Sequence, residues 1–374
     1  MKEADLRAEL LERFRRGAVA PLVEAEFERL ALAVFRHQFE HNAPYRAYCE
    51  RQNADPHSVK SWTEVPSVPT AAFKELPLVA GDPSAAALVF RTSGTTRGRE
   101  RRGAHHVLDP ALYEAAATAG FAAFVAPDIE RLTVVSLVPA PRDLPDSSLA
   151  YMIDLIARAF GDASSVCVAG SDGALDVARL VAALERATAE GRAVALLGTT
   201  LSFTHALDLL EASAQRFRLA PGSRLMDTGG TKGGVRAVDE AAQRARYERA
   251  FGIPQTFCVN EYGMTELLSQ CYDRILYEQI RPAGRHNTAR VKAGPPWLRT
   301  RVMDPETLRP VQRGRTGILQ HFDLANLDSV AAVQTEDLGR PAQHGFVLSG
   351  RASGAPPRGC SIAMDLLMEA ARST

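Results

Sequence analysis

Short apolar runs alternate with helical segments from Leu88 to Asn260, and this alternation constrains the fold more than any other feature of the sequence. The runs LTVVSLV, AVALLGTT and TFCVN have the length and β-branched content of buried strands. The segments between them have helical periodicity, and one of them begins at a good capping pair, Asp109-Pro110. Strands that alternate with helices predict an α/β fold with a largely parallel sheet and helices on its faces.

The segments on either side of this core have different sequence patterns. Residues 3–40 have apolar positions at helical spacing, and a proline-punctuated stretch follows that suggests extended chain. After Leu298, the runs LRTRVMD, TGILQHFDL and VAAVQT predict a small antiparallel β subdomain. The last residues form a Gly/Pro-rich, hinge-like tail before a short helix at 364–371. The expected segments are a helical and wrapping part at 1–85, an α/β core at 86–295, the antiparallel subdomain at 296–350 and a flexible tail with Cys360 at 351–374.

Composition excludes several classes of protein. The 374 residues carry 44 basic and 44 acidic side chains, so no net field favours nucleic acid or an anionic membrane. We find no signal peptide and no apolar run of bilayer-spanning length, and we therefore expect a cytoplasmic protein. The five cysteines are scattered without a CxxC pair, which argues against a disulfide framework and against structural zinc.

The first motif with chemical potential is the loop TSGTTRG, which begins at Thr92. Glycine and hydroxyl residues between a strand and a helix can offer backbone N–H and side-chain O–H groups to phosphate oxygens. The loop lacks the GxxxxGK[ST] pattern of a Walker A motif. A polar surface turn is the alternative for this loop taken alone.

Three further motifs follow at the ends of predicted strands. NEYGMTE, at 260–266, offers an aromatic ring for a base, a threonine for a phosphate and a glutamate for Mg²⁺. DTGGTKGG, at 227–234, has glycines that let the backbone approach a flat ligand. TEDLG, at 335–339, offers a carboxylate to ribose hydroxyls. Each motif alone is equally compatible with an ordinary loop.

The order of these motifs resembles the adenylate-forming superfamily of acyl-CoA synthetases, luciferases and peptide-synthetase adenylation domains. Within it, the sequence is most similar to the acyl-protein synthetases, the long-chain-fatty-acid–protein ligases of bacterial luminescence, because TSGTT, TGGTKGG, NEYGMTELLSQCYD, TEDLG and RGCS occur in that family's order. The resemblance covers residues 60–361. It implies an adenylate-forming N-terminal-domain-like fold with mixed and parallel sheets, and a C-terminal lid domain that is missing or reduced.

The resemblance also implies ATP and Mg²⁺ as cofactors, with a role for each motif. The phosphates would be held by Thr92, Ser93, Gly94, Thr95 and Thr96. The adenine and acyl pocket would be lined by Gly229, Gly230, Thr231, Tyr262 and Gly263. Thr265 would touch the α-phosphate, and Glu266 would hold Mg²⁺. Asp337 would bind the ribose hydroxyls, with Arg351 near the nucleotide.

Two departures from the superfamily pattern weigh on this interpretation. The C-terminal region that carries a catalytic lysine in typical members is absent, and either Lys232 substitutes for that lysine or it is an exposed loop residue. The phosphate loop has Arg97 where the wider family has glycine. The neighbouring arginines compensate for this change or form a solvated face.

Cys360 and the His105-His106 pair complete the candidates. In the family that the sequence resembles, a cysteine in the context of Cys360 accepts the acyl group as a thioester, and Arg358 beside it would favour the thiolate. The alternative is that Cys360 is a small residue near the terminus without a chemical role. The other four cysteines are expected in the core. One of the two histidines would line the acyl-carboxylate pocket, or the pair lies on the surface.

These observations predict an ATP-dependent ligase that activates a carboxylic acid, with a fatty acid favoured, as acyl-AMP and transfers it to Cys360. The resemblance implies an acyl-protein reductase as partner. One alternative is adenylation of an aromatic or other acid with transfer to CoA, an amine or a carrier protein. An alternative of another class is a weakened homologue that binds a nucleotide or an aromatic acid without turnover.

Overall fold

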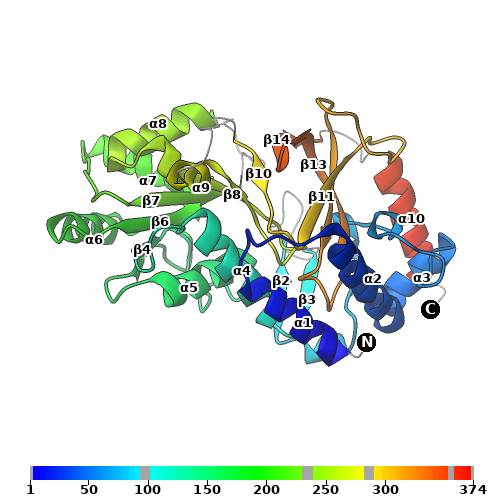
Figure 1. The fold of residues 1–374 in the computed structure, drawn as a ribbon. Coiled ribbons are helices and arrows are strands. Elements are labelled where there is room, and N and C mark those ends of the chain that lie inside the picture. Colours follow the sequence, from blue (N-terminus) through cyan, green and yellow to red (C-terminus); the bar gives the residue numbers. More distant parts are fainter. Residues whose placement is uncertain (1–2, 93–101, 230–238, 282–289, 353–357, 372–374) are drawn as a thin grey trace. The chain divides into compact units, whose positions relative to one another are not determined.

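The computed structural model describes residues 3–92, 102–229, 239–281, 290–352 and 358–371, and the chain divides into two compact units. The first unit combines residues 1–119, 264–270 and 291–374, and the second combines residues 120–263 and 271–290. Figure 1 shows the elements of both units. None of the helices that the structure describes combines the length and the apolarity needed to cross a bilayer.

A mostly parallel sheet forms the centre of the second unit, with the strand order β9-β8-β7-β6-β4-β5. The parallel strands are β4 (Thr133–Ser136), β5 (Val166–Cys167), β6 (Val194–Thr199), β7 (Arg224–Thr228) and β8 (Cys258–Tyr262). The last strand, β9 (Cys271–Asp273), is antiparallel to β8. Five consecutive residues of β6 are buried, as expected for a parallel strand that is covered on both faces.

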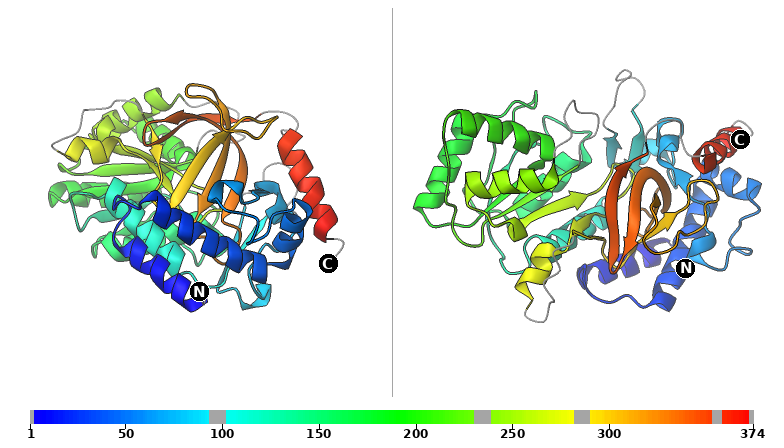
Figure 2. Two further views of the ribbon diagram at one scale, coloured as in Figure 1. Left: turned by 45° about the vertical axis from the view of Figure 1, so that its right-hand side comes forward. Right: turned by 90° about the horizontal axis from the view of Figure 1, so that it is seen from above.

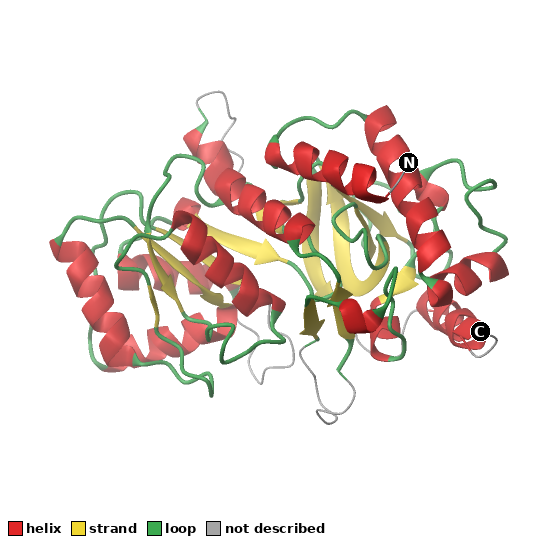
Figure 3. Ribbon diagram, turned by 90° about the horizontal axis from the view of Figure 1, so that it is seen from below, coloured by secondary structure: helices red, strands yellow, loops and turns green. Residues whose placement is uncertain are grey.

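Helices flank this sheet on both faces (Figure 3). They are α5 (Ser148–Phe160), α6 (Val177–Ala189), α7 (Thr200–Ala212), α8 (Glu240–Phe251), the short α9 (Ile275–Ile280) and the 3₁₀ turn η5 (Gln255–Phe257). Side chains of α6, α7 and α8 share one apolar cluster with β4, β6 and β7. The ends of α8 follow from local chemistry, because Asp239 caps its first backbone N–H groups and Gly252 ends it with a φ of 71°.

The sheet of the first unit is largely antiparallel. Its strands, in spatial order, are β11 (Leu298–Met303), β12 (Gly317–Asp323), β13 (Ala332–Ala342), β14 (Gly345–Arg351) and β10 (Lys292–Ala293), with β1 (Val68–Pro69) parallel to β13. The tight turn between β13 and β14 needs Gly345, which has a φ of 151°. A Cβ atom at that position would lie 1.9 Å from the carbonyl oxygen of Lys292, so no other residue fits there.

Helices from both ends of the chain cover the first unit, and Figure 2 shows α10 beside α3. The helices are α1 (Glu3–Arg15), α2 (Glu24–His41), α3 (Ala43–Arg51) and α10 (Arg358–Ala371), and α4 (Ala111–Phe124) contains the chain position at which one unit passes into the other. The proline-punctuated stretch contains the 3₁₀ turns η1 (Trp62–Glu64), η2 (Thr70–Lys74) and η3 (Pro83–Ala85). Phe14 of α1 stacks on the buried Trp297 with ring centroids 4.1 Å apart.

Three local predictions differ from the structure. The helix expected over 3–40 is two helices, because Gly17 has a φ of 101° and the chain does not return to helical geometry until Glu24. The run SSVCVAG, at 164–170, is also apolar enough to predict a strand, but it contains only the two-residue strand β5. The C-terminal helix begins at Arg358 rather than Met364, so Cys360 lies in its first turn and not in a loop. The division of the chain at 85, 295 and 350 remains a prediction.

Candidate active site

Two strands of the first unit hold the ends of the predicted phosphate loop. The strands β2 (Leu88–Arg91) and β3 (Ala104–Val107) pair antiparallel. Beyond β2, the backbone N–H of Thr92 donates to the carbonyl oxygen of Gly103 at 2.9 Å, and the Thr92 hydroxyl accepts from the Gly103 N–H at 2.9 Å. The loop residues 93–101 lie outside the described residues, and they include Ser93, Gly94, Thr95 and Thr96. Their phosphate role stays a prediction.

The expectation that this loop connects a strand to a helix is wrong, because a strand follows it. Residues of β3 alternate between half-buried and buried, with His105 and Val107 buried. That pattern has the period of two that a strand requires. The strand β3 was not predicted from the sequence, because its two adjacent histidines are polar residues that are more typical of a loop.

His105 connects β3 to the segment that contains Thr265 and Glu266. Its Nδ1 lies 2.7 Å from the carbonyl oxygen of Thr265 and must donate to it, because a carbonyl oxygen only accepts. Burial lowers the pKa of His105 to about 4, so the imidazole is neutral at physiological pH. Among the described residues, its buried Nε2 has no hydrogen-bond partner. The surface alternative is therefore wrong for His105, whereas His106 is half-buried.

Asn326 fixes the backbone of the same segment from the other side. Its side-chain N–H groups donate to the carbonyl oxygens of Glu266 at 2.8 Å and Val330 at 3.0 Å. Its side-chain oxygen accepts from the N–H of Leu268 at 3.0 Å. Both Asn326 and Glu266 are buried. The backbone of Glu266 is thus held by a side chain that the sequence places sixty residues later.

Asp323 completes this network. One of its carboxylate oxygens accepts from the N–H groups of Leu268 and Ser269, and the other accepts from the Ser269 hydroxyl and the Ala325 N–H. The side chain is fully buried, and that burial raises its pKa to about 6 despite the hydrogen bonds that favour the charged form. Sequence reasoning missed both residues. Their only signal is two polar side chains within the otherwise apolar run FDLANL.

The predicted ribose-binding pair lies on the neighbouring strands β13 and β14, at the end of their pairing that is distant from the turn between them. Asp337 and Arg351 are directly opposite each other in the antiparallel register. Asp337 is buried, and its N–H donates to the Thr335 hydroxyl at 3.0 Å. The Arg351 guanidinium donates to Glu336 at 2.6 Å. The structure therefore brings the two predicted residues to facing positions, although the ion pair of Arg351 is with Glu336.

The second unit carries the remaining described candidates at the carboxyl ends of β7 and β8. These strands are parallel neighbours, so Gly229 after β7 and Gly263 after β8 leave the sheet at the same edge. Gly229 has a φ of 82°, and its carbonyl oxygen accepts from the hydroxyl of Thr200 at 2.9 Å. Tyr262, the last residue of β8, is 7% exposed. Gly230, Thr231 and Lys232 lie outside the described residues.

A hydrogen-bond network fixes the carboxyl ends of β7 and β8. Asn260 donates to the Asp227 carboxylate at 2.8 Å, and the hydroxyl of the buried Tyr247 donates to the same carboxylate at 3.0 Å. The Thr228 hydroxyl donates to Glu261 on the neighbouring strand. Asp227 and Asn260, which open two of the sequence motifs, therefore fix the carboxyl ends of β7 and β8.

Two of the described cysteines, Cys49 and Cys258, are poor nucleophiles, because burial disfavours their thiolate forms. Burial raises the pKa of Cys258 to about 12, and it also raises the pKa of Cys49. Cys271 is buried and Cys167 is half-buried. Three of these four cysteines are core residues, as predicted. The backbone of Cys360 lies in α10, and its side chain is outside the description.

The residues around Glu266 fit a Mg²⁺ ion bound with a nucleotide. Mg²⁺ takes oxygen ligands, usually one or two carboxylates together with substrate phosphates. Glu266 supplies a carboxylate that is 8% exposed, and its neighbour Thr265 supplies a hydroxyl. His105 and Asn326 fix the backbone carbonyls of these two residues. The donor set is therefore suitable for Mg²⁺, and its backbone is fixed in advance.

Comparison with known proteins agrees with these features. The family model for LuxE acyl-protein synthetases matches residues 23–366. Two long-chain-fatty-acid–luciferin-component ligases are 21% identical to this chain. The Vibrio harveyi protein aligns over 83% of this chain and 78% of its own length, and the Aliivibrio fischeri protein gives the same coverage.

Solved structures of adenylate-forming enzymes share the fold. A 2-hydroxyisobutyryl-CoA ligase in complex with an acyl-AMP has a TM-score of 0.62 and 17% sequence identity, over 90% of this chain and 69% of that one. The open conformation of the 2-hydroxyisobutyryl-CoA ligase has a TM-score of 0.58. Because the family model spans most of the sequence, this chain belongs to the LuxE acyl-protein synthetase family of ligases and has an adenylate-forming fold.

Proposed function

We propose that this protein activates a fatty acid with ATP and Mg²⁺ to an acyl-AMP and then transfers the acyl group to Cys360. The observation that carries the proposal is the way the chain holds Thr265 and Glu266. Both backbone carbonyls accept hydrogen bonds from buried side chains, His105 and Asn326. A buried carboxylate on a backbone that is held in this way is suited to positioning a metal–phosphate complex.

In the first step, a carboxylate oxygen of the acid attacks the α-phosphorus of ATP and pyrophosphate leaves. The two reactants are anions, so the site has to offset their repulsion. Mg²⁺ supplies charge neutralisation when it is bound. Glu266 would hold it, the Thr265 hydroxyl would contact the α-phosphate, and Asp337 would orient the ribose. The neutral imidazole of His105 fixes Thr265 without adding or removing charge near the reaction.

In the second step, the thiolate of Cys360 attacks the acyl carbonyl, a thioester forms and AMP leaves. The position of Cys360 in the first turn of α10 supports this role. Backbone N–H groups in the first turn of a helix stabilise a negative charge and lower the pKa of a thiol there. The five residues that precede α10, 353–357, lie outside the described part of the chain.

The names of the relatives support a long-chain fatty acid as substrate, because both are long-chain-fatty-acid ligases. The acyl-protein reductase remains a proposed partner that would take up the thioester. An aromatic acid as substrate, or CoA as acceptor, is the competing assignment.

The first experiment measures pyrophosphate release with ATP and Mg²⁺ across a panel of fatty and aromatic acids. We expect release with long-chain fatty acids and a loss of at least about 100-fold in Glu266→Gln, in the range of losses seen when a transition-state electrostatic contact is removed. Glu306→Gln is the matched control, because Glu306 is exposed in the turn after β11. Equal rates in Glu266→Gln and wild type would remove Glu266 from the mechanism.

The second experiment follows the acyl group with an alkyne-tagged fatty acid. Labelling of the protein should be sensitive to hydroxylamine and absent in Cys360→Ser, while pyrophosphate release persists. Cys167→Ser is the control, since this half-buried cysteine lies elsewhere in the chain. Labelling that survives Cys360→Ser, or an acyl group that appears only on added CoA, would contradict transfer to Cys360.

A further inference from the structure

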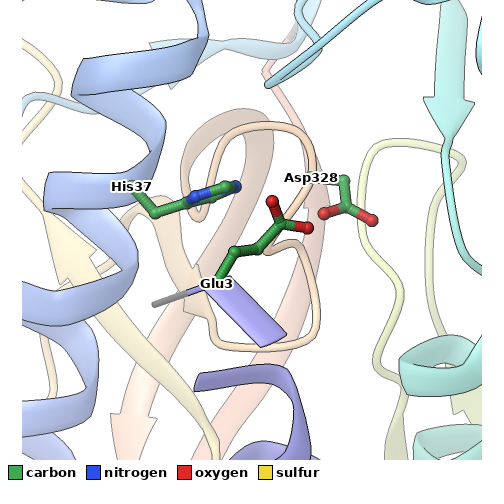
Figure 4. Close-up of side chains that lie close together, drawn as sticks. All are labelled: Glu3, His37 and Asp328. Atoms are coloured by element: carbon green, nitrogen blue, oxygen red, sulfur yellow. The ribbon is translucent and has the colours of Figure 1, made fainter. Parts of the chain in front are cut away.

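Glu3, His37 and Asp328 form a cluster within the first unit that the adenylation chemistry does not use. They come from α1, from α2 and from the loop after β12, respectively. Each offers one potential metal-ligand atom, and these atoms all lie within 4.8 Å of one another. Figure 4 shows the His37 ring directed toward the two carboxylates.

The His37 side chain has an unused nitrogen in this cluster. It is 7% exposed, and its buried Nε2 has no hydrogen-bond partner among the described residues. Burial lowers the pKa of His37, which favours the neutral form of the ring. A neutral imidazole is the form that binds metal ions, and a buried ring nitrogen without a partner is unfavourable in an ordinary core.

The carboxylates around His37 outnumber the cationic side chains that pair with them. Arg7 donates to Glu3 at 2.9 Å and to Asp328 at 2.6 Å, and its guanidinium lies 3.7 Å from Asp109. Three carboxylates thus share one guanidinium. His41, one helical turn after His37, brings a second imidazole with ring centroids 4.8 Å apart. The cluster therefore keeps an excess of negative charge.

A pocket of about 650 Å³ opens beside the cluster, and its lining includes Glu3, His37 and His41. This pocket brings solvent beside the His37 side chain. It also leaves space for water, which usually completes the coordination of an ion that has three protein ligands.

We propose that Glu3, His37 and Asp328 bind one divalent transition-metal ion, for which Zn²⁺ is the probe. One imidazole nitrogen and two carboxylate oxygens suit Zn²⁺ better than Mg²⁺ or Ca²⁺, which prefer oxygen ligands alone. Zn²⁺ bonds of about 2.0–2.1 Å place tetrahedral ligands about 3.4 Å apart. The side chains must therefore close by roughly an ångström, and Arg7 must release the two carboxylates.

An ion at this position would connect two N-terminal helices to the loop that supports Glu266. Asp328 lies two residues after Asn326, which holds the Glu266 carbonyl. Gln38, next to His37, already donates to the carbonyl oxygen of Asn326 at 2.7 Å and accepts from the N–H of Ala331. The expected effect of the ion is stabilisation of this loop.

The test measures Zn²⁺ binding to the metal-free full-length protein by competition with a chromogenic chelator, so its outcome does not depend on acyl activation. Wild type should bind one Zn²⁺ that is lost in His37→Asn and retained in His205→Asn, a matched control on an exposed face of α7. Arg7→Met should bind Zn²⁺ at least about 10-fold more tightly, because it removes the competing cation.

Co²⁺ gives a second measurement, because a tetrahedral site has a visible absorption band that Asp328→Asn should remove even if His37→Asn fails to fold. Equal Zn²⁺ stoichiometry and affinity in wild type, His37→Asn and Asp328→Asn would overturn the proposal. An Arg7→Met variant that binds no more tightly than wild type would also overturn it, since the cluster would then be only an ion-pair network.

Discussion

The most informative single substitution is Asn326→Leu, which keeps the branched shape and the number of heavy atoms of the side chain and removes its hydrogen bonds. Asn326 is fully buried. Its two N–H groups satisfy the carbonyl oxygens of Glu266 and Val330, and its oxygen accepts from Leu268. The N–H of Leu268 keeps a second acceptor, Asp323, at 3.1 Å. Two buried carbonyl oxygens therefore lose this partner.

The magnitude follows from that count. A buried polar group left without a partner costs about 1–3 kcal/mol, so the two carbonyls together cost about 2–6 kcal/mol of unfolding free energy. We expect this loss in urea denaturation, together with a lower kcat/KM for pyrophosphate release, because the backbone of Glu266 loses its support. Gln312→Leu is the matched control. It removes an exposed amide in the turn after β11 and should change stability by less than about 0.5 kcal/mol.

Two results would refute this reasoning. One is an Asn326→Leu protein whose stability matches that of Gln312→Leu, because the hydrogen bonds of Asn326 would then contribute nothing to the free energy of unfolding. The other is a large loss of stability with an unchanged kcat/KM below the unfolding transition, because the network would then support the fold and not the position of Glu266.

The remaining predictions concern other buried groups. The pKa of Asp323 in the folded protein is raised to about 6. Its contribution to stability is therefore full below about pH 4 and is lost as the pH rises through 6. The stability of wild type relative to Asp323→Asn should accordingly be greater at about pH 4.5 than at about pH 7. Asp128→Asn should destabilise the protein by about 3 kcal/mol in thermal or urea unfolding, because the fully buried Arg224 guanidinium loses its 2.6 Å ion pair. A loss of stability below about 1 kcal/mol would contradict this prediction. His105→Phe should lower kcat more than it raises the KM for ATP, because the ring positions Thr265 rather than binding nucleotide; a change confined to KM would point to direct contact instead.

The sequence predicted the elements of the second unit because they follow from local rules. The strands β6 and β8 are apolar runs of strand length, and α8 has both its N-cap, Asp239, and its terminating Gly252 in the sequence. The mixed α/β class and the antiparallel strands after Leu298 are confirmed for the same reason.

Features that depend on distant residues were not predictable. Leu268 and Ser269 form hydrogen bonds to Asp323, and no local pattern relates these positions. The strand β3 was missed because it contains two polar histidines, one of which, His105, is buried against the carbonyl oxygen of a distant residue, Thr265. The break at Gly17 was missed because a single glycine does not always end a helical pattern.

The candidate site was predicted in part. The motifs predicted strand-end positions for Glu266, Asp337 and Tyr262. All three are buried, but only Tyr262 ends a strand, because Asp337 lies within β13 and Glu266 lies in the loop between β8 and β9. The partners that hold the site, His105 and Asn326, do not belong to any motif. A motif therefore locates the groups that contact a ligand, whereas the side chains that fix their geometry emerge only from the fold.

Acid-dependent exchange of labelled pyrophosphate into ATP tests the central claim most directly, because it reports reversible formation of an acyl-AMP and needs no acyl acceptor. The proposed mechanism predicts exchange with long-chain fatty acids that requires Mg²⁺, persists in Cys360→Ser and disappears in Glu266→Gln. Absence of exchange with every acid, in a protein that still binds ATP, would contradict acid activation by this chain.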